Sequence, residues 1–376
     1  MSVQRVLIVG AGFTGLTAAI ALAREGVEVK VVDKVKEWAP VGHGLTIQGN
    51  ALKVFKELGV YDDIAKVAWP EQNGVTLRLS SGDLMVHVDT PRTGGDDLPP
   101  TIGALRPALH DLLVAKAEEH GAVFQVGTEL VGFENHRSTA SAELSDGSNE
   151  QWDLIIVAEG IHSRTRAKLG ITEEPAPSGL GIWRGLVPRT PEMEGEIFFP
   201  VPYEGGAYKV GYTPISADQC YFFVLCPPVR PDNGLEDWQE AKRLLEQFHG
   251  SFDYLREAIT AETFLNFQEI EWIFVEGPWH RGRVLALGEV VHAVPPLIAQ
   301  GAAQCVEDSL VLAEHVTREG DLEEQLQAFY ARRIPRIRGV VDASMQLARW
   351  EQNPGTSGGR DGEVMGAALG ALMAPA

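Results

Sequence analysis

A glycine-rich turn near the N-terminus constrains the fold of this chain more than any other feature. Residues 5–10, RVLIVG, form a short apolar run that predicts a buried parallel strand. Residues 14–25 are rich in Ala and Leu and predict a helix. Residues 27–32, VEVKVV, predict a second strand. The order strand, glycine-rich turn, helix, strand is that of a βαβ unit.

The glycines of this turn stand at the positions that a dinucleotide-binding unit requires. Gly10 permits the tight turn, Gly12 lets the backbone approach a pyrophosphate, and Gly15 lets the helix pack closely on the strand. The start of the helix then faces the phosphates with unpaired N–H groups. Asp33, at the end of the second strand, is placed to accept hydrogen bonds from a ribose. The turn predicts a bound dinucleotide but does not distinguish NAD from FAD.

The charge and the cysteine content exclude several other classes of protein. The 376 residues include 52 acidic and 32 basic side chains, so the formal net charge is −20. This charge argues against binding to nucleic acid or to an anionic membrane, and it means that an anionic substrate needs a local positive group. Three cysteines without a CxxC pair predict neither a disulfide framework nor a zinc site. No metal site, secretory signal or membrane-spanning segment is expected, and we predict a cytoplasmic protein.

Further along the chain, the pattern of elements predicts two interleaved lobes. Short aromatic β segments separated by Pro and Gly fill residues 180–227 and predict a mostly antiparallel sheet. Helices are predicted over 303–317 and 322–351, the second interrupted near Pro335. We predict a discontinuous dinucleotide-binding domain that comprises residues 1–73, 101–176 and 278–352. A β-sheet domain, residues 74–100 and 177–277, is inserted into it. Residues 353–376 are predicted to form a flexible tail.

Two later segments carry a family resemblance. Residues 153–166 read DLIIVAEGIHSRTR, a strand followed by a turn and by Ser and Arg. Residues 282–308 read GRVLALGEVVHAVPPLIAQGAAQCVED. With the N-terminal turn, these segments resemble the three fingerprints of the class A FAD-dependent aromatic hydroxylases, of the para-hydroxybenzoate hydroxylase type. The resemblance spans residues 3 to 350. It implies an α/β protein with a Rossmann-like FAD-binding domain of the GR2 type, an inserted, mostly antiparallel β-sheet substrate domain and C-terminal helices.

The resemblance also assigns residues to FAD. Glu159 and Glu289 stand where the family has Asp, and Ala303 replaces a frequent Asn. The carboxylates keep their charge but gain a methylene, so FAD affinity could differ from the family norm. The residues implied to contact FAD are Gly10, Gly12, Thr14, Gly15, Asp33, Lys34, Gly44, Leu45, Arg106, Leu130, Glu159, Gly288, Glu289, Pro296, Ala299, Gln300, Gly301, Ala302 and Ala303.

The activity implied by the resemblance is aromatic hydroxylation. In this family NADH or NADPH reduces the FAD, O2 adds to give a flavin C4a-hydroperoxide, and its terminal OH is transferred to an electron-rich ring. No second GxGxxG is present, which fits a transiently bound reductant. The expected substrate is a small phenolic or N-heteroaromatic compound, and the nearest similarity is to hydroxylases of hydroxypyridine carboxylates or urate. A monomer or homodimer is expected. The alternative is an FAD-dependent dehydrogenase or reductase that inserts no oxygen.

The substrate is expected between the flavin and the aromatic sheet. Lys209 and Tyr221 are the predicted catalytic residues: the ammonium could pair with a substrate carboxylate or enolate, and the phenol could help a ring hydroxyl ionise. Equally, Lys209 could be a surface residue and Tyr221 part of the sheet core. His43 could touch flavin or substrate or be a solvated loop residue. The predicted substrate contacts are Arg184, which could instead be an ion-pair partner, together with Tyr203, Tyr212 and Pro295; Trp183, Phe199 and Phe223 are further candidates.

Overall fold

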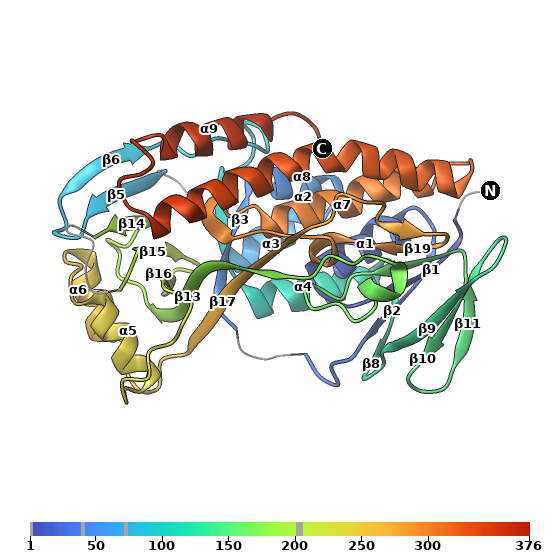
Figure 1. The fold of residues 1–376 in the computed structure, drawn as a ribbon, viewed down its shortest axis with the longest axis horizontal. Coiled ribbons are helices and arrows are strands. Elements are labelled where there is room, and N and C mark those ends of the chain that lie inside the picture. The colour runs from blue at the N-terminus through green and yellow to red at the C-terminus, as the bar shows by residue number, and fades with distance from the viewer. Residues whose placement is uncertain (1–2, 39–41, 71–73, 201–205) are drawn as a thin grey trace.

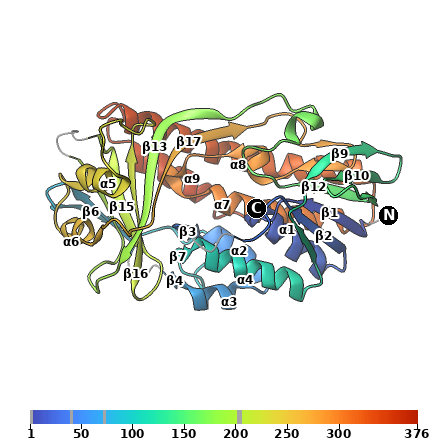
Figure 2. The same cartoon turned by 90° about the horizontal axis from the view of Figure 1, so that it is seen from below.

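The structure is a computed structural model, and it describes residues 3–38, 42–70, 74–200 and 206–376. Its first layer is a six-stranded sheet at the end of the molecule that carries the N-terminus (Figures 1 and 2). Strands β19, β12, β1, β2 and β8 are parallel, and β18 is antiparallel to β19. In spatial order the strands are β18 (His280–Arg281), β19 (Val284–Ala286), β12 (Leu154–Val157), β1 (Arg5–Val9), β2 (Glu28–Asp33) and β8 (Val123–Val126).

This parallel sheet is covered on both faces, which is why its strands are apolar runs without alternation. Every residue of β12 is buried, as are the last four of β1. Helix α1 (Phe13–Arg24) packs against α4 (Arg106–Glu119) and α7 (Gly301–Val316). A small antiparallel sheet adjoins the layer and is built from β9 (Leu130–Asn135), β10 (Ala140–Leu144) and β11 (Asn149–Trp152). The predicted Rossmann-like domain is therefore confirmed.

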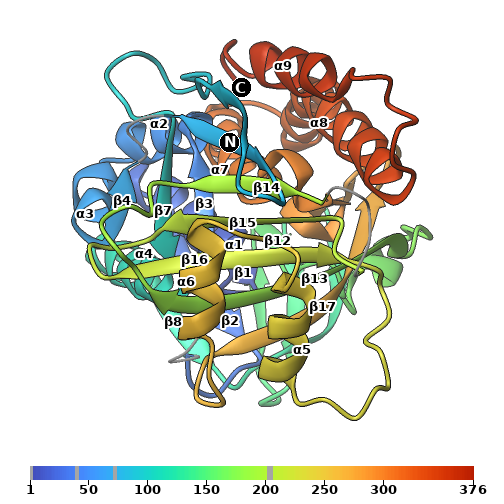
Figure 3. The same ribbon diagram turned by 90° about the vertical axis from the view of Figure 1, so that its left-hand side faces the viewer.

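An eight-stranded sheet forms the other end of the molecule (Figure 3). It is mostly antiparallel, apart from the parallel pair β14 and β5. The long strands β13 and β17 pair with each other and run from this sheet back toward the first layer (Figure 1). In spatial order the strands are β20 (His292–Ala293), β17 (Leu265–Phe274), β13 (Ala176–Pro188), β16 (Gln219–Cys226), β15 (Lys209–Pro214), β14 (Glu196–Phe199), β5 (Val75–Leu79) and β6 (Leu84–Val88).

The two faces of the eight-stranded sheet pack against different elements. The outer face lies under α5 (Asp237–Leu245) and α6 (Ser251–Ala258) (Figure 3). Trp183, Phe198 and Phe222 belong to the core that the sheet shares with these helices. The inner face packs on the 3₁₀ turn η3 (Pro296–Ile298) and on α8 (Leu322–Gln352) and α9 (Asp361–Ala371). The alternation of side chains along each strand therefore decides which residues face the rest of the protein.

A third small sheet bridges the two ends of the molecule. Its strands β3, β7 and β4 are antiparallel, and β3 contacts β16 of the large sheet and α7 of the first layer. The remaining elements are β3 (Gly44–Gln48), β4 (Ala68–Pro70), β7 (Thr101–Leu105), α2 (Gly49–Glu57), α3 (Tyr61–Val67), and the 3₁₀ turns η1 (Arg166–Leu169) and η2 (Gly288–Val290).

Two expectations for the C-terminal region were wrong. Helix α8 continues through Pro335 without a break, since neighbouring turns of this 31-residue helix hold it on α7. The segment predicted as a flexible tail contains α9, which lies along α8 (Figure 1). Leu369 of α9 and Leu372, which follows it, pack in a core with α8. The low aromatic content of this segment concealed a small apolar face. Within the described ranges, no helix combines the length and apolarity needed to cross a membrane, and no three His, Cys, Asp or Glu side chains meet as metal ligands.

Candidate active site

The first glycine turn is shaped by contacts that exclude side chains at two positions. Gly10 has a φ of +107°, and a Cβ there would lie 2.3 Å from the carbonyl oxygen of Ala158 in the loop after β12. A Cβ on Gly15 would lie 1.9 Å from the oxygen of Gly10. At Gly12, by contrast, a Cβ would meet nothing within 4 Å, and no side chain caps the N-terminus of α1. The helix therefore begins at an open position lined by backbone, which fits a pyrophosphate.

Asp33 is held at the carboxyl end of β2, beside this turn. Its carboxylate accepts hydrogen bonds from the backbone N–H groups of Ala11 (2.7 Å) and Val35 (2.9 Å) and stays half-exposed. Lys34 is exposed, and Leu130 is buried at the start of β9. The contact of Asp33 with a ribose and the contact of Leu130 with FAD therefore stay predictions.

The second and third segments meet the same turn from the other side. A Cβ on Gly288, whose φ is +66°, would lie 2.4 Å from Oγ1 of Thr14. Glu289 follows and is exposed. The carboxylate of Glu159 instead accepts hydrogen bonds within its own loop, from the Ser163 hydroxyl (2.6 Å) and the Thr165 N–H (3.0 Å). Glu159 therefore holds its loop in shape, and its predicted contact with FAD would require it to share these bonds.

A strained loop precedes α7. Ala299 has a φ of +51° and is the one non-glycine residue with a positive φ among those described. Gly301 and Ala302, half-exposed, open α7 with no side-chain cap, whereas Pro295 and Ala303 are buried and Pro296 is exposed. Gln300 is fully buried and its side chain is bonded to Asn50 and Gln304, so this side chain does not face the predicted cofactor site. Left-handed backbone at a non-glycine residue is typical of a functional site.

Arg106 lies between the glycine turn and the bridging sheet. Its guanidinium lies 5.6 Å from the ring centroid of Phe13, the first residue of α1. Its backbone N–H donates to the backbone carbonyl of His43 (3.1 Å). Gly44 and Leu45 follow in β3. A Cβ on Gly44 would lie 2.4 Å from the Cβ of Tyr221, so this loop rests directly on the eight-stranded sheet. Arg106 and His43 thus connect the predicted cofactor site to the sheet.

Three polar side chains meet where the loop touches the inner face of the sheet. Arg184 of β13 and Tyr221 of β16 lie on this face, diagonal to each other, because Arg184 pairs in register with Phe223. The Arg184 guanidinium lies close enough to the Tyr221 hydroxyl to lower the pKa of the phenol, and its Nη1 donates to Oε1 of Gln268 (3.0 Å). The ring of His43 is centred 6.1 Å from that of Tyr221. We call His43, Arg184 and Tyr221 the substrate cluster.

The protonation of the substrate cluster follows from burial and from the two arginines. Burial raises the pKa of Tyr221, and Arg184 only partly opposes this, so the phenol is neutral near pH 7. Burial lowers the pKa of His43 from 6.5 to about 4, helped by the charges of Arg184 and Arg106 and opposed by its bond to the Gly44 carbonyl. The cluster at neutral pH therefore consists of one cation and two uncharged hydrogen-bonding groups.

The structure corrects the prediction for Tyr212. This residue lies on the outer face of the sheet, is 2% exposed, and donates its hydroxyl hydrogen bond to Glu196 (2.5 Å) under α6. Trp183 faces the same side. Neither can contact a substrate on the inner face. Phe199 and Phe223 share the inner face with Tyr221, and the predicted contact Tyr203 lies outside the described residues.

Lys209 faces the inner side of the sheet but has a carboxylate partner. Its ammonium forms an ion pair with Glu351 of α8, and the two side chains are 13% and 14% exposed. The charge that was predicted to pair with a substrate is therefore already compensated within the protein. Of the two residues predicted as catalytic, only Tyr221 belongs to the substrate cluster.

We expect the Lys209–Glu351 pair to act on stability. Lys209→Met should lower the free energy of unfolding by about 3 kcal/mol, because it removes the positive charge that offsets a largely buried carboxylate. The double variant Lys209→Met, Glu351→Gln should recover most of the lost stability. Its turnover should stay within about threefold of the parent, which corresponds to less than about 1 kcal/mol of activation free energy. Denaturant unfolding and steady-state assays measure both. If the double variant folded but lost its turnover, Lys209 would be a catalytic residue and not only a stabilising one.

The pKa of His43 predicts a specific pH dependence of stability. Between pH 6.5 and about 4 the unfolded chain binds a proton on His43 that the folded chain does not, so stability falls as the pH is lowered. The loss should reach about 2 kcal/mol at about pH 5 and be absent above neutral pH. His43→Gln should be less sensitive to acid by that amount in denaturant titrations. Identical pH profiles for the two proteins would contradict a buried, neutral His43.

Some functional positions had no sequence signal that pointed to them. Gln268 supports Arg184 from β17, and only the alternation of that strand could have placed it on the inner face. Asn50 bonds to Gln300 across 250 positions of sequence, and nothing local indicates this. Such contacts depend on how segments that are distant in the sequence pack together, which no local pattern encodes.

Comparisons with known proteins agree with this geometry. Residues 4–344 match the FAD binding domain family. The YetM protein of Bacillus subtilis is 33% identical over 351 residues, covering 92% of this chain and 93% of that protein. A 2-heptyl-3-hydroxy-4(1H)-quinolone synthase of Mycobacteroides abscessus is 28% identical and covers 92% and 90%. The crystal structure of Klebsiella pneumoniae HpxO with FAD and uric acid superposes with a TM-score of 0.80 at 25% identity, covering 98% and 92%.

Proposed function

The chain belongs to the FAD binding domain family and is an FAD-dependent monooxygenase, and we propose that its substrate is an anionic, nitrogen-containing aromatic ring held by the substrate cluster. The three fingerprints had predicted this enzyme class, and the relatives favour it over the alternative of a dehydrogenase or reductase without oxygen insertion. The reductant, we propose, is NADH or NADPH. It binds transiently, since the chain has one glycine-rich dinucleotide turn.

The observation that carries the proposal is the uncompensated charge of Arg184. Within the described ranges Arg184 forms no ion pair, and its partners, the Tyr221 hydroxyl and the Gln268 amide, are both neutral. It is nevertheless half-buried in a protein with a net charge of −20. A half-buried guanidinium without a carboxylate is a ready site for an anion, which it can bind through two N–H groups.

The FAD would be held by residues whose surroundings leave room for it. The open position at Gly12, the uncapped starts of α1 and α7, and the left-handed backbone at Ala299 fit this cofactor. Arg106 adds a positive charge beside α1. When bound, the flavin supplies the activation of O2. Side chains of the protein orient the substrate and hold its protons.

The substrate cluster would orient the ring and hold its protons. Arg184 binds the anionic group of the substrate, and Gln268 fixes the guanidinium plane. The neutral Tyr221 phenol donates a hydrogen bond to the ring oxygen. In neutral His43, Nδ1 donates to the Gly44 carbonyl (2.7 Å), so Nε2 is left as an acceptor for a ring O–H or N–H. Drawing that proton toward Nε2 raises the electron density of the ring that is to be oxygenated.

The relatives narrow the chemistry of the ring. One is named for a 3-hydroxy-4-quinolone, and another was crystallised with uric acid. Both compounds are fused nitrogen heterocycles with acidic or enolic groups. We therefore propose such heterocycles, and hydroxypyridine carboxylates, as the substrate class of this chain.

Matched pairs of compounds test the proposal. Purified holoenzyme is assayed for NADH or NADPH consumption with each acid and its uncharged analogue, for example a hydroxypyridine carboxylate and its carboxamide. The anion should be preferred in kcat/KM by at least about tenfold, the effect of one charge-assisted hydrogen bond. Equal kcat/KM within each pair across the panel would contradict an anion site at Arg184. Running both nucleotides in parallel identifies the reductant.

A further inference from the structure

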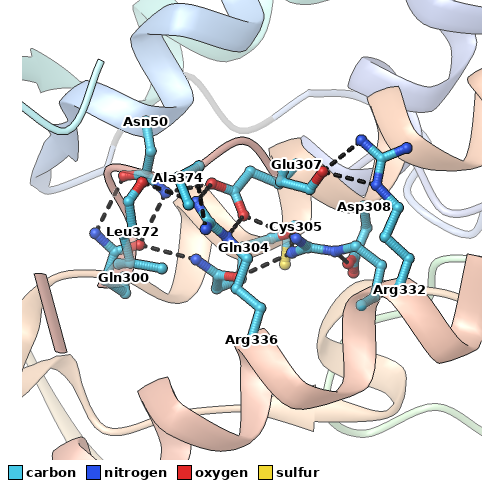
Figure 4. A network of polar contacts seen from close by, with 12 residues as sticks. Asn50, Gln300, Gln304, Cys305, Glu307, Asp308, Arg332, Arg336, Leu372 and Ala374 are labelled. Carbon is cyan, nitrogen blue, oxygen red and sulfur yellow. Dashed lines mark hydrogen bonds and ion pairs between the residues drawn. The ribbon is translucent and has the colours of Figure 1, made fainter. Parts of the chain in front are cut away.

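A buried polar cluster lies behind the strained loop that precedes α7 (Figure 4). It joins α2, α7 and α8, and most of its side chains are at most 3% exposed. These side chains cannot touch a cofactor or substrate, yet one of them belongs to the loop itself. We call this set the loop-support cluster; its members are Asn50, Gln300, Gln304, Glu307, Asp308, Arg333 and Arg336.

The loop end of the cluster is a reciprocal amide pair. Nδ2 of Asn50 donates to Oε1 of Gln300, and Nε2 of Gln300 donates to Oδ1 of Asn50, both at 3.1 Å. Gln304 also donates to Oε1 of Gln300 (3.0 Å). Gln300 directly follows Ala299, whose φ is +51°. A left-handed alanine costs about 1 kcal/mol and persists only where neighbouring contacts determine it, and the amide pair supplies such contacts.

Glu307 connects the amide pair to α8. Its Oε1 accepts from Nδ2 of Asn50 (2.7 Å) and from Nη2 of Arg336 (2.7 Å), while Oε2 accepts from Arg333 (2.9 Å) and from Nε of Arg336 (2.8 Å). Burial works to raise the pKa of Glu307, but the arginines outweigh it and hold the pKa below its usual range. One carboxylate oxygen is thus shared by the loop side and the α8 side of the cluster.

The far end of the cluster is the C-terminal segment. Arg336 uses its remaining donors on the carbonyls of Leu372 and Ala374, both at 3.0 Å (Figure 4). Arg332 donates to the carbonyl of Ala376 (2.7 Å). Leu372 is 2% exposed and anchors this segment in the core shared by α8 and α9. Residues 372 and 374 therefore accept hydrogen bonds that Arg336 does not donate to Glu307.

We propose that Asn50 and Arg336 are positioning residues for the loop at Ala299, and that residues 372–376 act as a strap that holds Arg336, and through it Glu307, Asn50 and Gln300, in place. The proposal rests on the proposed function only in placing the flavin beside this loop. The loop geometry itself is a property of the protein without its cofactor, so it can be tested separately from activity.

Hydrogen exchange in FAD-free full-length protein tests the positioning role. Asn50→Ala and Arg336→Lys should each raise the exchange rate over residues 296–304 by about tenfold, because each removes support from the loop. Exchange in α1 should stay unchanged. Since both variants act through Glu307, the double variant should exchange more slowly than the product of the single effects predicts. Arg338→Lys is the matched control: it lies two residues on in α8, in an exposed pair with Glu276.

A second pair of measurements separates positioning from general loosening. Leu372→Ala removes the side chain that anchors the strap in the core of α8 and α9, and it should raise exchange both in the strap and over residues 296–304. In reconstituted protein, Asn50→Ala should shift the flavin midpoint potential, whereas Arg338→Lys should not. The positioning role would be overturned if exchange over residues 296–304 stayed unchanged in Asn50→Ala and Arg336→Lys, or if exchange rose equally throughout the chain. The role of residues 372–376 as a strap would be overturned if Leu372→Ala raised exchange only within those residues. If Asn50→Ala does not fold, Asn50→Asp, which sets a second carboxylate beside Glu307, takes its place.

Discussion

Replacing Gly12 by alanine is expected to weaken FAD binding by about 100-fold or more without destabilising the FAD-free protein. Gly12 has φ −75° and ψ −177°, a conformation that alanine adopts freely, and a Cβ there would meet no atom within 4 Å. The methyl group would instead occupy the space at the start of α1 where backbone must approach the pyrophosphate. Titration with FAD followed by flavin fluorescence, together with thermal unfolding of the apoprotein, measures the two effects.

Gly15→Ala is the matched control for this prediction. A Cβ on Gly15 would lie 1.9 Å from a backbone oxygen, so this variant should lose apoprotein stability as well as FAD binding. A Gly12→Ala protein that binds FAD as tightly as the parent would contradict the placement of the pyrophosphate. One that unfolds like Gly15→Ala would contradict the description of Gly12 as an open position.

Replacing Arg184 by methionine is expected to lower kcat/KM for the anionic substrate by about 100-fold, equivalent to about 3 kcal/mol. The aliphatic part of the side chain is largely kept, but the guanidinium that is proposed to bind the anion and that lies beside Tyr221 is removed. FAD content should not change, because the residues assigned to the cofactor lie on other elements. Arg184→Lys should recover part of the loss, since it restores the charge without the planar fork. Steady-state kinetics with a carboxylate substrate and its carboxamide measure the effect.

Arg230→Met provides the control for the loss of one positive charge. Arg230 lies 5.8 Å from the ring centroid of Trp183, on the outer face of the same sheet, and pairs with Asp237. It should alter kcat/KM by no more than about twofold, because a distant, solvent-screened charge contributes little. If Arg184→Met affected the carboxylate and the carboxamide equally, Arg184 would be a structural residue and not an anion-binding one.

The parts of the fold that the sequence predicted are those with strong local patterns. The glycine turn, the apolar strand of residues 154–158 and the helix after the third fingerprint each follow from spacing within about 20 residues, the scale of a βαβ unit. Tyr221, predicted as catalytic, and Tyr212, predicted as a substrate contact, were both assigned to the substrate site because an aromatic strand does not reveal which of its faces meets the rest of the protein. The observed register separates them: Tyr221 lies on the inner face and Tyr212 on the outer one.

Contacts between distant segments could not be predicted in this way. Glu351 neutralises Lys209 across 142 positions, and Asn50 supports Gln300 across 250. The C-terminal segment is rich in Gly and Ala and carried no signal for packing, yet Leu369 and Leu372 fit a core formed by α8 and the inner face of the sheet. The charge of −20 argued against broad classes of partner, whereas the anion-binding role proposed for Arg184 rests on neutral partners that the sequence did not reveal.

The most direct test of the assigned reaction is the origin of the oxygen in the product. Purified holoenzyme is given isotopically labelled O2, NADH or NADPH and a panel of hydroxypyridine carboxylates, quinolones and urate-like heterocycles, and the products are analysed by mass spectrometry. We predict that at least one anionic heterocycle gains a single labelled oxygen atom as NAD(P)H is consumed. A product that is oxidised without labelled oxygen, or that takes its oxygen from water, would contradict monooxygenation.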